Sequence, residues 1–138
     1  MEKKELLKLI EDLKVDKNEI VILSTGALVL RGIMDQANDL DIAVTKKGLE
    51  QLKNNYNLVQ KPNGFYIVND LVECVEDEME GKKELVDKYY LQDIHDYYNF
   101  IKNSGREKDI PKIKPVEEYI RERETNVIKK LKSKRKYE

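Results

Sequence analysis

The sequence predicts a single α+β domain of 138 residues, with a mixed β-sheet flanked by helices and a helical C-terminal part. Three observations favour this class. Helical periodicity alternates with short apolar runs in the first half, clusters of turn residues separate these segments, and the second half carries apolar residues at helical spacing. We expect the core to span about residues 19–77 and the helical part about residues 78–138.

The first elements alternate between helix and strand. Apolar residues recur at helical spacing over residues 6–13, which predicts an amphipathic helix. The continuous apolar run 20–23 then predicts a buried strand. Ser24 and Thr25 are good capping residues, so we expect them to open a short helix that Gly32 ends.

A second strand and a run of hairpins follow. The second strand contains Asp39 and Asp41, and Thr45 is expected to cap a helix that runs to about residue 56. Three more strands are predicted, separated by turns at Pro62-Asn63-Gly64 and at Asn69-Asp70; they span residues 58–61, 65–68 and 71–75. The resulting order indicates a mixed sheet with helices on one side.

From Asp77 onward the pattern becomes helical. Apolar and aromatic residues at helical spacing predict a helix over 91–101, which Ser104-Gly105 stops. Prolines interrupt a short element that begins at 106–109, and a last helix is expected from about residue 116.

The composition excludes several classes of protein. Lys and Arg number 26 and Asp and Glu number 27, so no global charge points to nucleic acid or to an acidic partner. One cysteine, Cys74, excludes an internal disulfide and fits a reducing compartment. The first residues lead into an amphipathic segment, and no apolar run approaches the ~18 residues of a membrane span. We therefore expect a soluble cytoplasmic domain with no membrane partner.

The most informative segment is Asn38-Asp39-Leu40-Asp41-Ile42-Ala43-Val44. The period-two geometry of a strand puts Asp39 and Asp41 on one face and the apolar residues on the other. Two neighbouring carboxylates repel each other, and Asp is a poor strand former, so a bound divalent cation is the simplest compensating cause. Mg²⁺ takes oxygen ligands and often shares them with substrate phosphates. The alternative is a half-exposed strand with a polar outer face.

The segment from residue 20 to residue 44 resembles the core of the nucleotidyltransferase superfamily, which has the DNA polymerase β-like fold. A strand, a tight turn of small residues, a short helix and a strand with Asp-apolar-Asp follow in that order. The closer resemblance is to small bacterial and phage nucleotidyltransferase-like proteins, including the toxin component of abortive-infection systems. Gly105-Arg106-Glu107-Lys108-Asp109 is similar to a second motif of those proteins. The matching residues of the first motif are Ser24, Thr25, Ala27, Leu28, Gly32, Asp39 and Asp41.

This resemblance implies an enzyme that moves a nucleoside monophosphate from a nucleoside triphosphate to an acceptor. It implies that Asp39 and Asp41 hold Mg²⁺ or Mn²⁺, and that the turn holds the triphosphate through its hydroxyls and backbone amides. The third carboxylate of the superfamily corresponds best to Glu73, as metal ligand or base, because Glu76 faces the opposite side of its strand. The residues implied to contact the nucleotide are Ser24, Thr25, Gly26 and Arg31, although Arg31 also suits an ordinary surface position.

The residues of the turn also allow interpretations other than an enzyme. Ser24 stands where the superfamily usually has glycine and Thr25 where it usually has glycine or serine, and a side chain here hinders the close approach of a phosphate. A non-catalytic binding or regulatory protein is therefore the alternative, and an unrelated α+β interaction domain is a third possibility. The acceptor (a small molecule, RNA or protein) is undefined, as is an antitoxin-like protein partner.

Two features of the second half also have two interpretations. We expect Arg106, Lys108 and Asp109 to form an internal ion pair that braces the last helices against the sheet, in preference to a catalytic role. The basic end, which comprises Lys129, Lys130, Lys132, Lys134, Arg135 and Lys136, suits either a solvated helix C-terminus or an RNA-binding surface.

Overall fold

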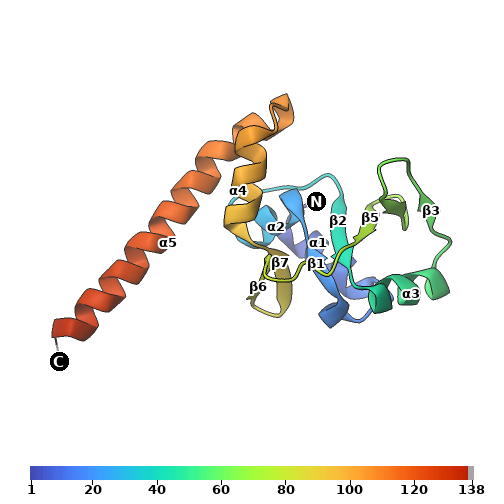
Figure 1. The fold of residues 1–138 in the computed structure, drawn as a ribbon, viewed down its shortest axis with the longest axis horizontal. Helices are drawn as coiled ribbons and strands as arrows, with labels where there is room; N and C mark the ends of the chain where they lie inside the picture. Colours follow the sequence, from blue (N-terminus) through green and yellow to red (C-terminus); the bar gives the residue numbers. More distant parts are fainter. Residues whose placement is uncertain (137–138) are drawn as a thin grey trace. The chain divides into compact units, whose positions relative to one another are not determined.

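A computed structural model describes the backbone of residues 1–136 and the side chains of residues 1–134. Its order of helices and strands confirms the α+β class, and the chain forms two compact units, Met1–Asp93 and a second unit from Ile94 onward. The first unit contains the sheet and the second is helical (Figure 1).

The first unit begins with helix α1 (Lys3–Asp12), followed by a short 3₁₀ turn (Lys17–Glu19) and strand β1 (Ile20–Ile22). Helix α2 (Ser24–Leu30), strand β2 (Leu40–Val44) and helix α3 (Lys46–Asn55) come next. The remaining strands are β3 (Val59–Gln60), β4 (Tyr66–Ile67), β5 (Val72–Glu76), β6 (Lys83–Val86) and β7 (Tyr89–Gln92). The strands expected from residue 20 to residue 76 are thus confirmed.

Within the described residues these strands form one seven-stranded sheet in the order β3-β4-β5-β2-β1-β7-β6. Strand β1 is antiparallel to β2 and parallel to β7, and β2 is parallel to β5. The sheet is therefore mixed, as the sequence predicts. Because β1 and β7 end at the edge where β2 and β5 begin, residues from four strands meet at one edge of the sheet.

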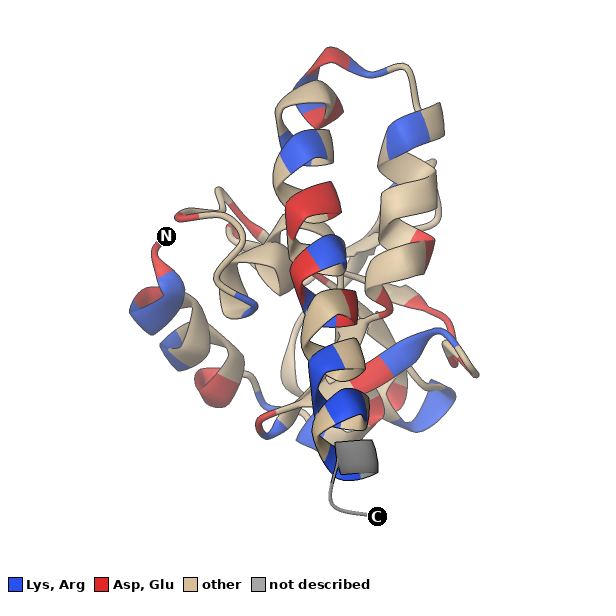
Figure 2. Ribbon diagram, turned by 90° about the vertical axis from the view of Figure 1, so that its left-hand side faces the viewer, with Lys and Arg blue, Asp and Glu red and all other residues tan. Residues whose placement is uncertain are grey.

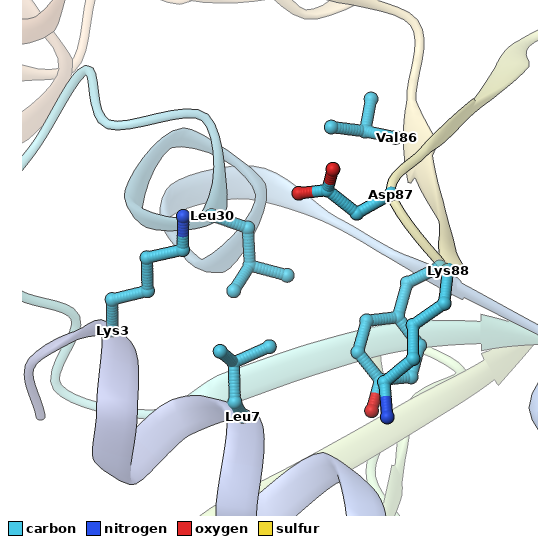
Figure 3. Close-up of a pocket in the computed structure, with 7 residues that line it drawn as sticks. Lys3, Leu7, Leu30, Val86, Asp87 and Lys88 are labelled. Atoms are coloured by element: carbon cyan, nitrogen blue, oxygen red, sulfur yellow. The ribbon is translucent and has the colours of Figure 1, made fainter.

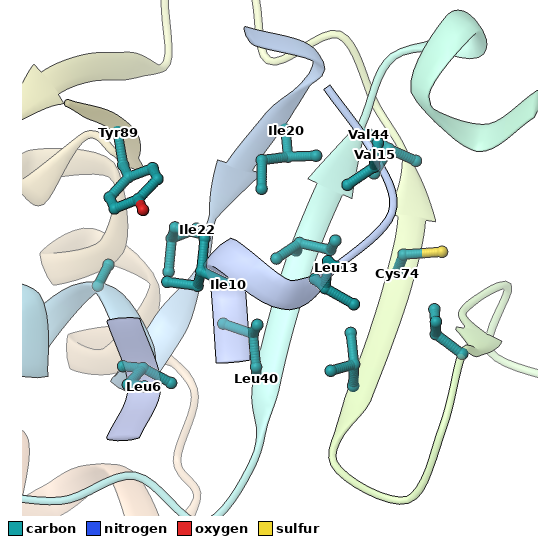
Figure 4. Packing of buried hydrophobic residues seen from close by; sticks show 14 of the residues in the cluster. Leu6, Ile10, Leu13, Val15, Ile20, Ile22, Leu40, Val44, Cys74 and Tyr89 are labelled. Carbon is teal, nitrogen blue, oxygen red and sulfur yellow. The ribbon is translucent and has the colours of Figure 1, made fainter. Parts of the chain in front are cut away.

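The main core lies on one face of the sheet, where α1, α2 and α3 cover it. Leu6 and Ile10 of α1 pack with sheet residues such as Ile22, Leu40 and Cys74 (Figure 4). Helix α2 ends at Leu30, and Gly32, which follows its C-cap residue Arg31, has a φ of +78° that glycine adopts without strain. The helices flank one face, which leaves the alternate residues of β1, β2 and β5 on the other face.

The prediction of a helical character from Asp77 onward is wrong for β6 and β7, which form an antiparallel hairpin at the edge of the sheet. Leu91, predicted to lie in a helix, is fully buried in β7. The hairpin turns at Asp87, with a φ of +56°, and Lys88, without the glycine that usually signals such a turn.

The second unit contains helix α4 (Ile94–Asn103), a 3₁₀ turn (Glu107–Asp109) and helix α5 (Ile110–Lys136). The expected helix start near residue 116 is wrong, because α5 begins six residues earlier and carries Pro115 inside it. Pro111 is the second residue of α5, where the backbone amide has no partner within the helix, and Pro115, the sixth residue, removes one backbone hydrogen bond.

Charge is unevenly distributed along α5. Lys and Arg gather towards its C-terminal end, whereas its first half mixes both signs (Figure 2). Side chains 121–134 are exposed throughout. The side chains of Arg135 and Lys136, part of the predicted basic end, lie outside the described part of the chain.

Candidate functional site

The second face of the sheet carries two of the three predicted carboxylates. Asp41 alternates with the buried residues Leu40 and Ile42, and Glu73 alternates with Val72 and Cys74, which all belong to the main core. Asp41 and Glu73 therefore project to the opposite side, and the parallel register of β2 and β5 pairs them directly. We call this side the carboxylate face.

Asp39 lies at the edge of the carboxylate face, not within the strand. Strand β2 begins at Leu40, and Asp39 is exposed in the preceding loop. The expectation that both aspartates belong to the strand thus holds for Asp41 alone. Because Asp39 precedes Asp41 by two residues, it still stands at the same edge of the sheet.

The turn between β1 and α2 is the immediate neighbour of Asp41. The amide of Leu23 donates to the backbone oxygen of Asp41 at 2.9 Å. Ser24 follows with a φ of +53°, which is left-handed backbone where glycine is usually found. Leu23, not Ser24 or Thr25, is the N-cap residue of α2, and no side chain caps this helix. The expected capping role of Ser24 and Thr25 is therefore wrong, although both are half-buried at the predicted turn.

A glutamine that the sequence did not single out closes the turn. The amide of Ser24 donates to Oε1 of Gln92 at 3.1 Å, across 68 residues of sequence. Gly26, two residues further along α2, is buried, and a Cβ there would lie 3.3 Å from Cγ2 of Ile22 and 3.5 Å from Leu40. Its missing side chain therefore allows α2 to pack closely on the sheet.

Glu73 has a cationic partner. Nζ of Lys61 lies 2.9 Å from Oε1 of Glu73, and the two side chains are 37% and 28% exposed. The thiol of Cys74, the next residue along β5, is unreactive, because burial raises its pKa to about 11 and keeps it protonated.

Arg31 lies away from the carboxylate face. Its guanidinium is paired with Glu84, and only 1% of its side chain is exposed. Glu84 is the register partner of Leu91, a main-core residue, so this ion pair lies on the helix-covered face. The structure therefore does not bring Arg31 together with the other predicted nucleotide contacts.

Two of the three predicted carboxylates remain candidate ligands for a hard cation. Among the residues that the structure describes, no group of three or more His, Cys, Asp or Glu side chains is arranged to hold a metal ion. The carboxylates of Asp39 and Asp41 are the ligand type that Mg²⁺ and Mn²⁺ prefer. Glu73 instead has Lys61 within ion-pair distance.

The Gly105–Asp109 segment forms an ion-pair cluster within the second unit. Asp109 is fully buried and accepts from Ser104 Oγ at 2.7 Å, Arg106 Nε at 2.7 Å and Lys112 Nζ at 3.2 Å. The predicted pair of Arg106 and Asp109 is confirmed, and Lys112 supplies the second cation in place of Lys108. These contacts join the end of α4 to the start of α5.

A small apolar hollow lies apart from the carboxylate face. It has a volume of about 210 Å³ and lies between α1, the end of α2 and the β6–β7 turn (Figure 3). Leu7, Leu30, Val86 and Tyr89 form its walls, and these residues belong to the main core or pack against it. The hollow therefore opens on the helix-covered side of the sheet.

Comparison with known proteins adds no family assignment. The sequence matches no protein-family model, and no curated protein is significantly similar to it. In the part of the chain that the structure describes, no helix has the length and apolar character needed to cross a membrane.

Proposed function

We propose that the chain is a nucleotidyltransferase-like protein that moves a nucleoside monophosphate from a nucleoside triphosphate to an acceptor hydroxyl or phosphate. One observation carries this proposal: the strand register aligns the β1–α2 turn, Asp41 and Glu73 on adjacent strands at one sheet edge. The order of helices and strands from β1 to β5, with β1 antiparallel and β5 parallel to β2, supports the same assignment.

The predicted carboxylates and the turn residues each have a role in this proposal. Asp39 and Asp41 would hold Mg²⁺, which when bound supplies positive charge to the triphosphate. The amides and hydroxyls of Ser24 and Thr25 bind the phosphates. An acceptor oxygen attacks the α-phosphorus, the bond to the β-phosphate bridging oxygen breaks and pyrophosphate leaves. Glu73 takes the proton of an acceptor hydroxyl.

A second function has support from the turn itself. Ser24 has left-handed backbone, and its amide already bonds to Gln92. A nucleotide must replace this hydrogen bond to use the amide, which favours a non-catalytic protein that binds nucleotides weakly and regulates a partner. Binding without release of pyrophosphate would distinguish this alternative from the enzyme.

Thermal melting with Mg²⁺ and each of the four nucleoside triphosphates tests the proposed site. Ligand that binds only the folded state stabilises it by ~2.7 kcal/mol at about a hundred times its dissociation constant. We expect one or more nucleotides to raise the melting temperature of the wild type, and Asp41→Asn to abolish the rise.

Glu76→Gln is the matched control, because it removes a carboxylate of the same strand that is exposed and does not lie on the carboxylate face. This control should keep the full rise in melting temperature. Equal rises in the wild type and in Asp41→Asn would overturn the proposed site.

A further inference from the structure

Lys61 is held beside Glu73 by the turn that follows it. Its amide donates to the backbone oxygen of Phe65 at 2.7 Å, and its own oxygen accepts from the amide of Gly64 at 3.0 Å. The amide of Phe65 also donates to the side chain of Asn63 at 3.1 Å. Two backbone hydrogen bonds thus fix the Cα of Lys61, which limits the positions that its ammonium group can reach.

The same turn is anchored on the carboxylate face. Phe65 and Val75 pack against a small cluster of buried residues on that side of the sheet, which includes Val21, Leu23 and Ala43. Val75 follows Glu73 by two residues on the same face of β5. The ion pair of Lys61 with Glu73 is therefore part of a packed arrangement at the predicted site.

We propose that Lys61 supplies to Glu73 the positive charge that a second divalent cation would otherwise bring, so that the carboxylate face binds one cation, at Asp39 and Asp41. This inference rests on the proposed function. An ammonium group at 2.9 Å from Oε1 occupies the space that a cation would need to reach that oxygen. An ammonium also has three N–H donors, and the ion pair uses one.

The remaining donors of Lys61 suit a phosphate. The side chain is 37% exposed, so solvent and a ligand can reach part of it. A triphosphate oxygen is a strong acceptor for such donors, because both partners are charged. Lys61 would thereby bridge Glu73 and the nucleotide, which selects for ligands that carry a polyphosphate.

The number of bound Mn²⁺ ions tests this inference. The signal of free Mn²⁺ in electron paramagnetic resonance is titrated with the full-length protein, in the presence of a non-hydrolysable nucleoside triphosphate analogue and with the free nucleotide accounted for. We expect one protein-dependent ion for the wild type and two for Lys61→Met, because Glu73 becomes available. Lys61→Arg retains the charge and should keep one ion.

Two further variants separate the possible causes. Lys47→Met removes an exposed lysine of α3 and should keep one ion. Lys61→Met combined with Glu73→Gln should return to one ion. Two ions on the wild type, or one on Lys61→Met with its melting temperature retained, would overturn the inference alone. No protein-dependent ion on the wild type or on Lys61→Met would overturn both the inference and the proposed function.

Discussion

Loss of the Arg106 side chain should weaken the second unit without affecting nucleotide binding. The carboxylate of Asp109 is fully buried and accepts hydrogen bonds from Ser104, Arg106 and Lys112. Arg106→Ala removes one charged hydrogen bond of 2.7 Å and leaves a buried carboxylate partly unpaired. Because Arg106 is 43% exposed, solvent screens the pair, and we expect a loss of about 2 kcal/mol.

The same cluster predicts a pH dependence. Burial by itself would raise the pKa of Asp109, but the hydrogen bonds from Arg106, Ser104 and Lys112 outweigh this effect and lower its pKa to about 2. A carboxyl group with a lowered folded-state pKa stabilises the protein above its unfolded-state pKa. Its contribution should therefore be complete above about pH 5 and should decline as the pH falls towards 2.

Hydrogen exchange of the full chain, measured by mass spectrometry on peptides from α4 and the start of α5, determines the local effect of Arg106→Ala. A loss of about 2 kcal/mol corresponds to ~30-fold faster exchange when reclosing is rapid. Arg121→Ala is the control, because Arg121 is exposed and should change stability by less than ~0.5 kcal/mol. Unchanged exchange combined with lost nucleotide binding would show that Arg106 acts in the nucleotide site.

Three other changes test the fold. Gly48→Ala should lower the free energy of unfolding by about 1–3 kcal/mol, because the added Cβ would lie 2.9 Å from the backbone oxygen of Glu19; an unchanged denaturation midpoint would contradict this packing. Ser24→Gly should stabilise the chain by about 1 kcal/mol, since glycine relieves the φ of +53°, and a lower melting temperature would count against the left-handed backbone. Amides of residues 122–134 should exchange rapidly, because that part of α5 is exposed on all sides, and strong protection there would indicate a packed partner.

The sequence was sufficient to predict the order of helices and strands in the first unit up to residue 76, because the local signals agree there. A continuous apolar run predicted β1, a glycine ended α2, and Thr45 capped α3 by accepting from the amide of Gly48 at 3.1 Å. The β6–β7 hairpin was missed because its turn, Asp87-Lys88, lacks glycine and because β6 carries the charged residues Lys83 and Glu84. Leu91 also lies three residues before Ile94, a spacing that imitates a helix.

The residues of the candidate site could be predicted only where the local sequence pattern determines their position. Asp39 and Asp41 form a local motif, and alternation distinguished Glu73 from Glu76. Lys61 and Gln92 were not predicted, because their contacts depend on strand pairing over 12 and 68 residues. The buried position of the Arg31 side chain was not predictable either, since its partner Glu84 belongs to the hairpin that the sequence did not predict.

The location of a bound cation shows whether the carboxylate face is a metal–nucleotide site. Mn²⁺ broadens the nuclear magnetic resonance signals of nearby amides, so substoichiometric Mn²⁺ added with a nucleoside triphosphate marks the site in ¹⁵N-labelled protein. We predict that broadening centres on Asp39 and Asp41 and extends to the Ser24 turn and the start of β5. Broadening centred instead on the acidic loop 77–80 or on the glutamates of α5, or no protein-specific broadening, would contradict a metal–nucleotide site on the carboxylate face.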